Sequence, residues 1–599
     1  MSNKTISDNN SWNFNTLTKV NFAKKRQAII LAHDKFIAKW QKNRAWLKDP
    51  LTLQKALADF EILKESYSNG AEEAFYCWLR SEVEENNTEV KAKFNQVNDF
   101  VLSLENKLQF FELSLARLPK SIQAKFSRAK NLQAYKHYLE KIFATSPYLL
   151  SDGEEKLMRL KSQSSYYNWV KMTSEFLSAE TAPVLTDSGK LVKKSLAEIS
   201  TLSKNQNKKV RDDAATKLNQ ILVKNIKVGE NELNSILADK KVNDELRHMS
   251  RPDLARHLSD DIDSATVDAM IKIVSDNFSV AKKYYQLKAK MFKVKKLKYH
   301  ERSVSFGDAK VKYSYEKAKD LLRVVLSDLD PEFLKIFNNF DKQGLIDVYP
   351  RTGKTSGAFC AAESLSMPTF IMLNHNETLN DVLTLAHEVG HGINNEMMRQ
   401  KQSALNFGAT LATAEVSSTF FEDFILKNIL RDCSDEVRLE ILMEKLNNDV
   451  STIFRQAALY LFEQELHQEF RAKGYLSAAE IGELFKKHMA AYMGDYVEQS
   501  KGAENWWLQW SHIRNYFYVY SYVSGLLISK HFQKKVAADK KFVEKVKYFL
   551  SAGLSESPRA IFAHMGININ DGAFWQEGIK EIKDLLVEAE TLAKKLKKI

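Results

Sequence analysis

Cysteine is scarce in this chain: there are three in 599 residues, Cys77, Cys360 and Cys433, and they stand far apart without a C-x-x-C pair. This excludes a disulfide framework and a zinc site built from thiolates. The sequence also lacks a run of about 18 uncharged apolar residues, and its first fourteen residues lack the apolar segment of a secretory signal. We therefore expect a soluble, cytoplasmic protein without a membrane partner.

Proline and glycine are few, with nine and twenty residues respectively. An all-β chain needs turn residues every 8–12 positions, whereas long helices need almost none. Apolar residues recur at helical spacing, as in Ile29, Ala32, Phe36 and Trp40. With 44% hydrophobic residues the chain has ample material for a core. We predict a mainly α, multi-helix protein.

Positive charge exceeds negative charge only modestly, with 88 Lys and Arg against 76 Asp and Glu. An excess of +12 over this length is too diffuse to indicate nucleic acid binding, and we predict no nucleic acid partner. One segment is rich in lysine, and we interpret it as a solvated helix face and its exit loop, the alternative being a polyanion site. Its lysines are Lys282, Lys283, Lys288, Lys290, Lys293, Lys295, Lys296 and Lys298.

The length predicts more than one domain, since domains usually have about 100–200 residues. A break at 178–190, with Pro183 and a Thr-Asp-Ser-Gly turn, separates a predicted N-terminal helical domain (1–190) from a predicted catalytic domain (191–599). Two short β-rich runs, 344–350 and 368–374, flank a glycine-containing loop and predict a small sheet.

Directly after this predicted sheet, Thr378 can cap a helix over 379–399 that contains His387-Glu388-Val389-Gly390-His391. Two histidines at i and i+4 lie on one face of a helix, so both rings can reach one metal ion. Glu388 can take the proton of a water that the metal activates. Gly390 and Gly392 are unfavourable inside a helix, which predicts that another backbone approaches closely there.

A catalytic zinc site needs a third protein ligand, and the segment 414–423 offers two glutamates, Glu415 and Glu422. They are seven residues apart, nearly two helical turns, so both carboxylates point the same way. One can bind the metal while the other hydrogen-bonds a ligand histidine. Glu396 is an alternative by composition, but it lies five residues past His391 and points elsewhere on the helix.

An aromatic segment near the C-terminus is a second candidate for the site. It follows His512 and contains the alternating tyrosines Tyr516, Tyr518, Tyr520 and Tyr522. A strand would place all four on one face, whereas a helix would bring Tyr518 and Tyr522 together. These residues are either aromatic core or donors of hydrogen bonds to the oxyanion of a tetrahedral intermediate.

Taken together, these motifs resemble the oligoendopeptidase F family, within the thimet-oligopeptidase-like zinc metallopeptidases. The resemblance covers nearly the whole chain in order. It departs at Ser417, where alanine is usual, and at Phe421, where a polar residue is common. The matching segments are Trp12-Asn13-Phe14, IDVYPRTGKTSGAFC (346–360), FIMLNHNETLNDVLTLAHEVGHG (370–392), AEVSSTFFE (414–422), Phe454-Arg455-Gln456, HIRNYFYVYSY (512–522), and Gly553, Ser557-Pro558 and Phe574-Trp575.

The resemblance implies one zinc per chain, held by His387, His391 and Glu415, with Glu388 as the catalytic base. It assigns support of the transition state to His512 and to a tyrosine among 516–522, for which we take Tyr518 and Tyr520 as candidates without predicting which of the four tyrosines faces the zinc.

The resemblance also implies the fold and the activity. It predicts a helical ellipsoid split by a deep channel, with the small sheet as one wall beside the zinc helix. The activity is hydrolysis of internal bonds in short unstructured peptides, with the peptide paired to the β-edge at 368–374.

Three alternatives differ in class. A carboxypeptidase or a dipeptidyl carboxypeptidase on the same scaffold differs only in what blocks the channel. A helical scaffold protein with a vestigial metal site is more distant. A nucleic-acid-associated protein is suggested only by the isoelectric point of about 9.1. The sequence makes no prediction of the oligomeric state.

Overall fold

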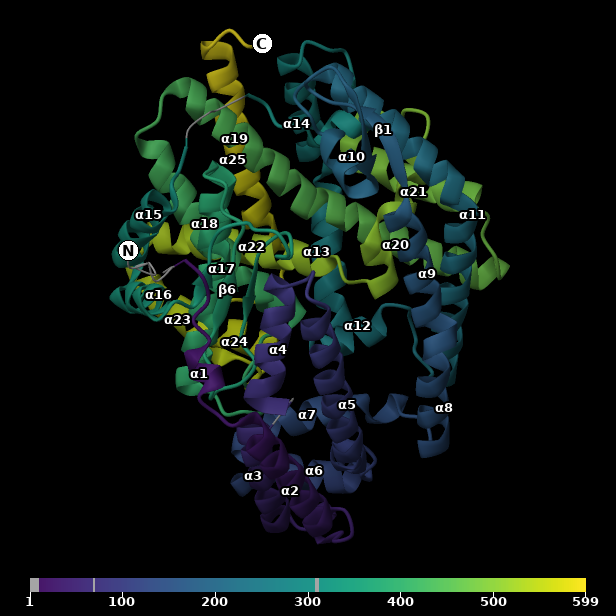
Figure 1. The fold of residues 1–599 in the computed structure, drawn as a ribbon, viewed down its shortest axis with the longest axis vertical. Coiled ribbons are helices and arrows are strands. Elements are labelled where there is room, and N and C mark those ends of the chain that lie inside the picture. The colour runs from purple at the N-terminus through teal and green to yellow at the C-terminus, as the bar shows by residue number, and fades with distance from the viewer. Residues whose placement is uncertain (1–9, 68–69, 308–311) are drawn as a thin grey trace, which may run out of the picture. The chain divides into compact units, whose positions relative to one another are not determined.

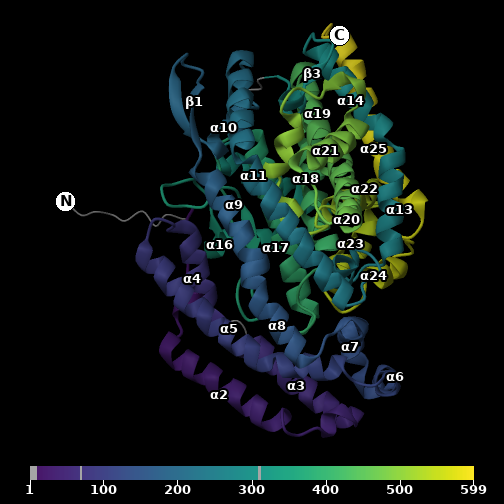
Figure 2. The ribbon, with the colours of Figure 1, turned by 90° about the vertical axis from the view of Figure 1, so that its right-hand side faces the viewer.

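The computed structural model describes residues 10–67, 70–307 and 312–599, so the first nine residues of the N-terminal segment considered above lie outside it. Helices dominate this part of the chain, and the strands form only small sheets (Figures 1 and 2). The predicted mainly α fold is therefore confirmed. None of the helices in the described residues is both long and apolar enough to cross a membrane.

The chain folds into two compact units, each built from separate segments. Unit 1 comprises 1–147, 310–431 and 532–567. It contains α1 (Asn15–Thr18), α2 (Phe22–Trp40), α3 (Pro50–Tyr67), α4 (Ala71–Val83), α5 (Thr88–Ala116), α6 (Lys120–Arg128), α7 (Lys136–Thr145), α15 (Tyr315–Leu329), α16 (Pro331–Gln343), α17 (Leu379–Lys401), α18 (Leu411–Arg431), α23 (Val543–Ala552) and α24 (Pro558–His564), with strands β4 (Ile346–Asp347), β5 (Phe359–Ala361) and β6 (Phe370–Met372).

Unit 2 comprises 148–309, 432–531 and 568–599, and α22 (Tyr520–Ala538) runs from it into unit 1. It contains α8 (Asp152–Ser162), α9 (Asn168–Ala179), α10 (Leu196–Leu202), α11 (Lys208–Leu246), α12 (Leu254–Ser259), α13 (Ser264–Asp276), α14 (Phe278–Met291), α19 (Asp435–Asp449), α20 (Gln456–Lys473), α21 (Ala478–Met493) and α25 (Gly572–Lys595), with strands β1 (Thr181–Leu185), β2 (Leu191–Ser195), β3 (Leu297–Lys298) and β7 (Val497–Glu498).

The predicted boundary at 178–190 coincides with an antiparallel hairpin of β1 and β2, in which Thr181 pairs with Ser195. The Thr-Asp-Ser-Gly turn closes this hairpin, and helical structure resumes at Leu196. The hairpin lies inside unit 2. The division into domains 1–190 and 191–599 stays a prediction, and it differs from the division into compact units.

The N-terminal helices of unit 1 pack around an aromatic core. Figure 2 shows α2, α3 and α5 running alongside one another. Trp46 stacks on Phe111 at 4.7 Å between ring centroids, and Phe60 lies 4.6 Å from Phe111. All three rings are buried. Burial of such large apolar surfaces, each stabilising by about 1.5–3 kcal/mol, explains why these amphipathic helices assemble.

The small sheet is present where the sequence predicts it, but its strand order corrects one expectation. The order is β4-β6-β5, with β4 parallel and β5 antiparallel to β6. Because β6 is the central strand, its backbone groups already pair with both neighbours. The expectation that 368–374 offers a free edge to a peptide is therefore wrong. The outer edges of the sheet belong to β4 and to β5, and the prediction had placed β5 in a loop.

The N-terminal motif Trp12-Asn13-Phe14 covers this sheet. The Trp12 indole N–H donates to the carbonyl of Ile371 at 2.8 Å, and its ring lies 5.8 Å from that of Phe370. The backbone N–H of Asn13 donates to Gly344. The first helix of the chain is thereby joined to a sheet more than 300 residues away in sequence.

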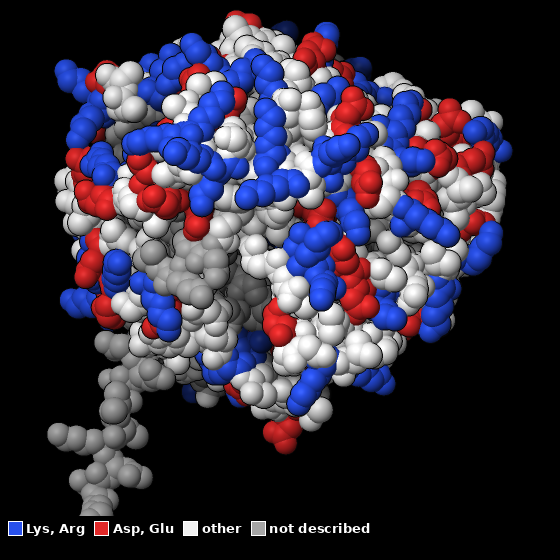
Figure 3. All heavy atoms as spheres, turned by 90° about the horizontal axis from the view of Figure 1, so that it is seen from above, with Lys and Arg blue, Asp and Glu red and all other residues white. Residues whose placement is uncertain are grey.

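The lysine-rich segment is mostly solvated, as interpreted from sequence. Six of its lysines are exposed, but Lys288 is buried and donates to the carbonyl of Arg302, and Lys298 pairs with Asp212. The interpretation is therefore wrong for Lys288, whereas the side chain of Lys298 remains 41% exposed. Figure 3 shows one face of the molecule, on which Lys and Arg side chains are interspersed with Asp and Glu.

Candidate metal centre

Helix α17 carries the His-Glu-x-x-His motif, and its start is fixed by local chemistry. The Thr378 hydroxyl accepts the N–H of Asp381, and the Asp381 carboxylate accepts the N–H of Thr378. This reciprocal capping satisfies two backbone donors that a helix start leaves unpaired. The helix runs from Leu379 to Lys401, close to the predicted 379–399.

The two glycines of α17 lie where neighbouring elements touch the helix. A methyl group at Gly390 would stand 2.8 Å from the Cα of Ser418 and 2.9 Å from the carbonyl oxygen of Ser417. At Gly392 it would stand 2.7 Å from the ring of Phe340. The predicted close approach of another backbone is therefore present at Gly390, where it is helix α18.

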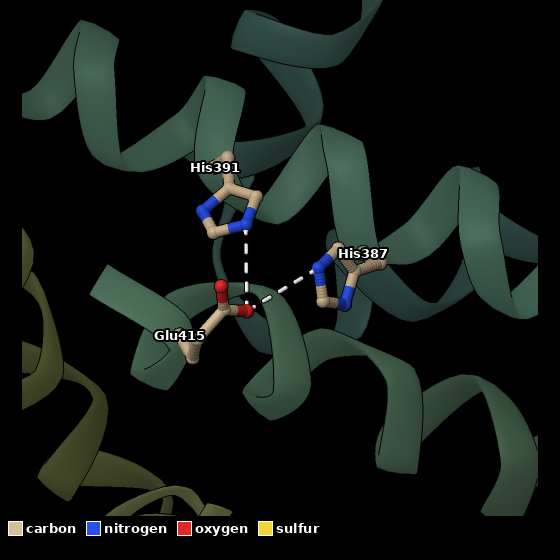
Figure 4. A group of neighbouring side chains, drawn as sticks. All are labelled: His387, His391 and Glu415. Atoms are coloured by element: carbon tan, nitrogen blue, oxygen red, sulfur yellow. Dashed lines mark ion pairs between the residues drawn. The ribbon is translucent and has the colours of Figure 1, made fainter. Parts of the chain in front are cut away.

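This close packing brings three candidate ligands together (Figure 4). His387 and His391 come from α17 and Glu415 from α18. Oε2 of Glu415 lies 3.4 Å from Nε2 of His387 and 3.7 Å from Nε2 of His391. The two imidazole planes are nearly perpendicular, at 82°.

These distances fit a tetrahedral metal. Ligand atoms about 2.0–2.1 Å from a tetrahedral zinc lie about 3.4 Å from one another, and one nitrogen–oxygen separation equals that value while the other is slightly longer. Two neutral imidazoles and one carboxylate are also a donor set that zinc accepts, and they leave a fourth position for water or substrate. The side chains present therefore fit the implied zinc ion.

A second group of metal-binding residue types, Asp212, His300 and Glu301 in unit 2, does not fit a metal. Its two carboxylates are already paired with cations: Asp212 with Lys208 and Lys298, and Glu301 with Arg211. A divalent ion there would have to displace these partners, so we interpret this group as a salt-bridge network.

Glu422, seven residues beyond Glu415 on α18, hydrogen-bonds Nδ1 of His387. The opposite ring nitrogen thus stays directed at Glu415. Burial lowers the pKa of His387, but the hydrogen bond and charge of Glu422 outweigh it and raise the pKa to about 9. A carboxylate in this position fixes the orientation of a ligand histidine, and a metal that binds at Nε2 displaces the proton that this raised pKa favours.

Replacing Glu422 by Ala should lower zinc affinity and peptide hydrolysis by about 10–100-fold, because His387 loses the group that orients it. Zinc affinity is measured by competition with a chelator, and activity with a quenched fluorescent peptide. Glu422→Gln keeps an acceptor for Nδ1–H and should recover most of the zinc affinity. A Glu422→Ala protein indistinguishable from the native one would make Glu422 an ordinary surface charge.

Burial also determines the pKa values of two further residues of the motif, His391 and Glu388. Burial, followed by the charge of His387, lowers the pKa of His391 to about 4, so its ring is neutral and keeps a lone pair for a metal at physiological pH. Glu388 is 6% exposed, and burial is the main cause that raises its pKa to about 7. A carboxyl group with such a pKa can both accept and return a proton near neutral pH.

Strand β5 lies against α17 beside Glu388, a neighbourhood that the sequence does not reveal. Asn395 donates to Sγ of Cys360 at 3.6 Å. Burial, and then the nearby charge of Glu388, raises the pKa of the Cys360 thiol. A strand predicted over 359–361 would have indicated this contact, but the sequence analysis assigned these residues to the glycine-containing loop.

Glu396, the alternative ligand by composition, lies away from the candidate centre. Its carboxylate accepts hydrogen bonds from Thr369 and Arg399. Ser417 and Phe421, the two departures from the family pattern, are buried, and Phe421 packs edge-on against Phe333 at 5.2 Å. Neither departure removes a ligand.

The aromatic segment belongs to unit 2, where it begins α22, so the helical alternative applies. Tyr518 and Tyr522 are adjacent, with ring centroids 5.4 Å apart. Nε2 of His512 lies 3.2 Å from the Tyr522 hydroxyl, and its ring stands 5.8 Å from that of Tyr518. These three residues form one cluster on the same side of the segment.

Tyr520 points the other way. It is fully buried, and its hydroxyl donates to Asp260 at 2.6 Å within unit 2. In contrast, the hydroxyl of Tyr518 has no hydrogen-bond partner among the described residues, and its side chain is partly exposed. Of the two predicted tyrosines, only Tyr518 has a hydroxyl free to donate to another group.

The turn that precedes these tyrosines is strained and firmly held. Tyr516 and Phe517 have φ of 41° and 55°, values that residues other than glycine rarely adopt. The N–H of Phe517 donates to the buried carboxylate of Glu463 at 2.7 Å, and Arg256 donates to the carbonyls of Asn515 and Tyr516. The sequence gives no sign of this anchor.

Burial raises the pKa of Glu463 to about 8. A carboxyl group whose pKa is higher in the folded than in the unfolded state favours folding at low pH, and this advantage disappears as the pH rises through the folded value. We expect the free energy of unfolding to fall between about pH 4.5 and 8, with this group contributing up to about 1.4 kcal/mol per pH unit. Glu463→Gln should remove that part of the slope in urea unfolding, and an unchanged slope would contradict the assignment.

Comparison with known proteins then identifies the family. The family model described as peptidase family M3 matches residues 201–581, and the model described as oligopeptidase F matches residues 115–179. The chain belongs to peptidase family M3. The predicted resemblance to oligoendopeptidase F is thus confirmed, and so is the predicted class of enzyme, a metalloendopeptidase.

Individual members of family M3 match over most of their length. Group B oligopeptidase PepB of Streptococcus agalactiae is 24% identical over 81% of both chains. An oligoendopeptidase F homolog of Borreliella burgdorferi is 24% identical over 89% of this chain and 92% of its own. The crystal structure of oligoendopeptidase-F from Enterococcus faecium superposes with a TM-score of 0.72 at 18% identity, covering 96% of this chain and 99% of that one.

Proposed function

We propose that this chain is a zinc-dependent oligoendopeptidase that hydrolyses internal bonds of short, unstructured peptides in the cytoplasm, with one zinc per chain on His387, His391 and Glu415. The observation that carries the proposal is the position of Oε2 of Glu415, 3.4 Å and 3.7 Å from Nε2 of His387 and His391, with the buried Glu388 between the two histidines in the sequence. Membership of family M3 and the names of its relatives agree with it.

The residues divide the chemistry among them. Zinc, when bound, supplies a Lewis acid that polarises water and the peptide carbonyl. Glu388 takes the proton of the attacking water and returns it to the leaving amine, and its pKa of about 7 suits both transfers. Glu422 holds the ring of His387 so that Nε2 stays directed at the metal position.

An extended peptide can be held by backbone pairing. Strand β5 is one of the two outer strands of the sheet, and it lies beside Glu388, so its free edge is a place where a substrate strand can add. Pairing through the main chain positions the scissile bond without reading side chains. This supports broad sequence tolerance and a requirement for unstructured substrates.

The family resemblance assigns transition-state support to His512 and a tyrosine, and this assignment stays part of the proposal. Tyr518→Phe removes a single hydroxyl and should lower kcat by about 10²–10³-fold with little change in KM. Tyr520→Phe should instead destabilise the fold by about 1–3 kcal/mol, since Asp260 loses a buried donor. Steady-state kinetics and thermal unfolding of both variants distinguish the roles, and equal kinetics for Tyr518→Phe and the native protein would remove the tyrosine from the mechanism.

The deciding experiment is mass spectrometry of the products from a mixture of peptides of 6–20 residues, with and without a chelator. We expect internal cleavage that stops with the chelator and returns with zinc. Release of single C-terminal residues would indicate a carboxypeptidase, and release of C-terminal dipeptides a dipeptidyl carboxypeptidase. No cleavage by the zinc-loaded protein would favour the scaffold alternative, and efficient digestion of casein would contradict the limit on substrate size.

A further inference from the structure

Unit 2 contains a cavity of about 480 Å³ whose lining includes His512, to which the proposed function gives a role, together with cationic residues that have no task in the proposed mechanism. It is lined by α10 and the residues just after it, the 3-10 helix 299–303, the end of α19, the π-helical segment 450–455 and the segment 503–512; α10 and α19 are labelled in Figure 1. Three cationic side chains line it, Lys204, Arg302 and Arg455, with one carboxylate, that of Glu444. The formal charge of the lining is therefore three positive minus one negative, an excess of two.

None of these three cations has a carboxylate within 4 Å among the residues that the structure describes. Two buried arginines of unit 2 differ in this respect, since Arg211 pairs with Glu301 and Arg514 with Glu232, whereas the buried Lys288 donates to the carbonyl of Arg302. Burying a charge without a partner is costly. The cavity is thus a place where the fold tolerates unpaired positive charge.

Arg302 is 7% exposed and held in place by aromatic rings. Its guanidinium carbon lies 4.0 Å from the ring centroid of Tyr299 and 4.7 Å from that of Trp506, and Nη1 donates to the carbonyl of Tyr299. Its Nε is buried and has no hydrogen-bond partner in the described structure. Stacking fixes the orientation of the guanidinium while leaving donors unused.

Two more buried donors around the cavity lack acceptors in the described structure. These are Nε of Arg455 and the indole Nε1 of Trp510, a residue only 6% exposed. Lys204 adds a further donor, although more than a third of it is exposed; desolvation and then the charges of Arg302 and Arg455 lower its pKa. The lining also holds two buried acceptors without donors in the described structure, Oε2 of Glu444 and Oε1 of Gln456. Three buried donors thus stand against two buried acceptors, and the cations in excess repel one another.

We propose that this cavity is a binding site for an oxyanion, namely a carboxylate or a phosphate group. An oxyanion accepts several hydrogen bonds at once, suits the guanidinium geometry, and neutralises the excess charge. Arg455 belongs to the segment Phe454-Arg455-Gln456, which the family resemblance picks out but the hydrolytic mechanism leaves without a task. The site stands independently of the proposed peptidase activity, because its occupancy is measured without any hydrolysis.

The test is isothermal titration calorimetry of the full-length protein with two probes, inorganic phosphate and succinate, at constant ionic strength set by sodium chloride. Saturable binding is expected for at least one probe. Arg455→Gln and Lys204→Gln should each weaken it by about 10–100-fold, the loss expected for one charge-assisted hydrogen bond. Lys283→Gln is the matched control, since Lys283 is an exposed cation of unit 2 outside the cavity, and it should bind as the native protein does.

The outcomes separate clearly. Binding of phosphate alone assigns the site to phosphate, and binding of succinate assigns it to carboxylate-bearing ligands such as acidic peptides. Absence of saturable binding for both probes would overturn the proposal, and so would unchanged affinity in both cavity variants. If Arg455→Gln fails to fold, as judged by circular dichroism, Lys204→Gln decides, because its largely exposed side chain is dispensable for packing.

Discussion

Replacing Glu388 by Gln should leave one zinc per chain bound while kcat falls by about 10²–10⁴-fold or more, the range expected for loss of a general base. Glutamine keeps the shape and the oxygen of the side chain but cannot take a proton from water. The three candidate ligand atoms belong to other residues, so metal content and peptide binding should both persist.

Metal content by atomic absorption and kcat with a quenched peptide measure the two roles separately. Glu396→Gln is the matched control: it makes the same substitution on the same helix, at a carboxylate bonded to Thr369 and Arg399. It should keep activity near the native value. Loss of zinc from Glu388→Gln would make Glu388 a ligand or a structural support, and normal turnover by that variant would refute the hydrolytic mechanism.

Replacing Glu415 by Ala should remove both zinc and activity. Its Oε2 is the atom that lies within 3.4 Å and 3.7 Å of the two histidine nitrogens, and it supplies the only negative charge among the three candidate ligands. Two neutral imidazoles alone leave the metal with too few protein ligands for a catalytic site.

The measurement is zinc stoichiometry after dialysis against a weak chelator, followed by activity with added zinc. Glu396→Ala is the matched control, because composition alone would also allow Glu396 as a ligand. We expect the Glu396→Ala protein to retain its zinc. A Glu415→Ala protein with one zinc per chain and full activity would transfer the ligand role elsewhere, with Glu422 the next residue to replace.

Much of the metal centre could be predicted because its determinants are local. The spacing of His387 and His391 places both rings on one helix face, and Thr378 marks where that helix begins. Glu415 and Glu422 could be placed on a common face by the same periodicity. Only the packing of α18 against Gly390 was needed to join the two helices, and the glycine itself indicated that contact.

Long-range contacts explain what the sequence concealed. The order of the three strands depends on pairing between 346–347, 359–361 and 370–372, and short strands carry too little periodicity to reveal which one is central. The opposite directions of Tyr518 and Tyr520 follow from the buried partner Asp260, which lies 260 residues earlier in the chain. The unpaired cations around Arg302 likewise come from segments that only the fold brings together.

The interleaving of the two units has a consequence for synthesis on the ribosome. All four residues of the candidate metal centre, including Glu388, have been translated by residue 415, but unit 1 is not complete until residue 567. Helix α23 packs on α17, and Asn394 donates to the carbonyl of Leu550. A growing chain therefore carries these side chains for the 135 residues from 415 to 550 before their helix contacts α23, which takes about 7–27 s at about 5–20 residues per second. We therefore expect a chain that ends before α23 to lack peptidase activity.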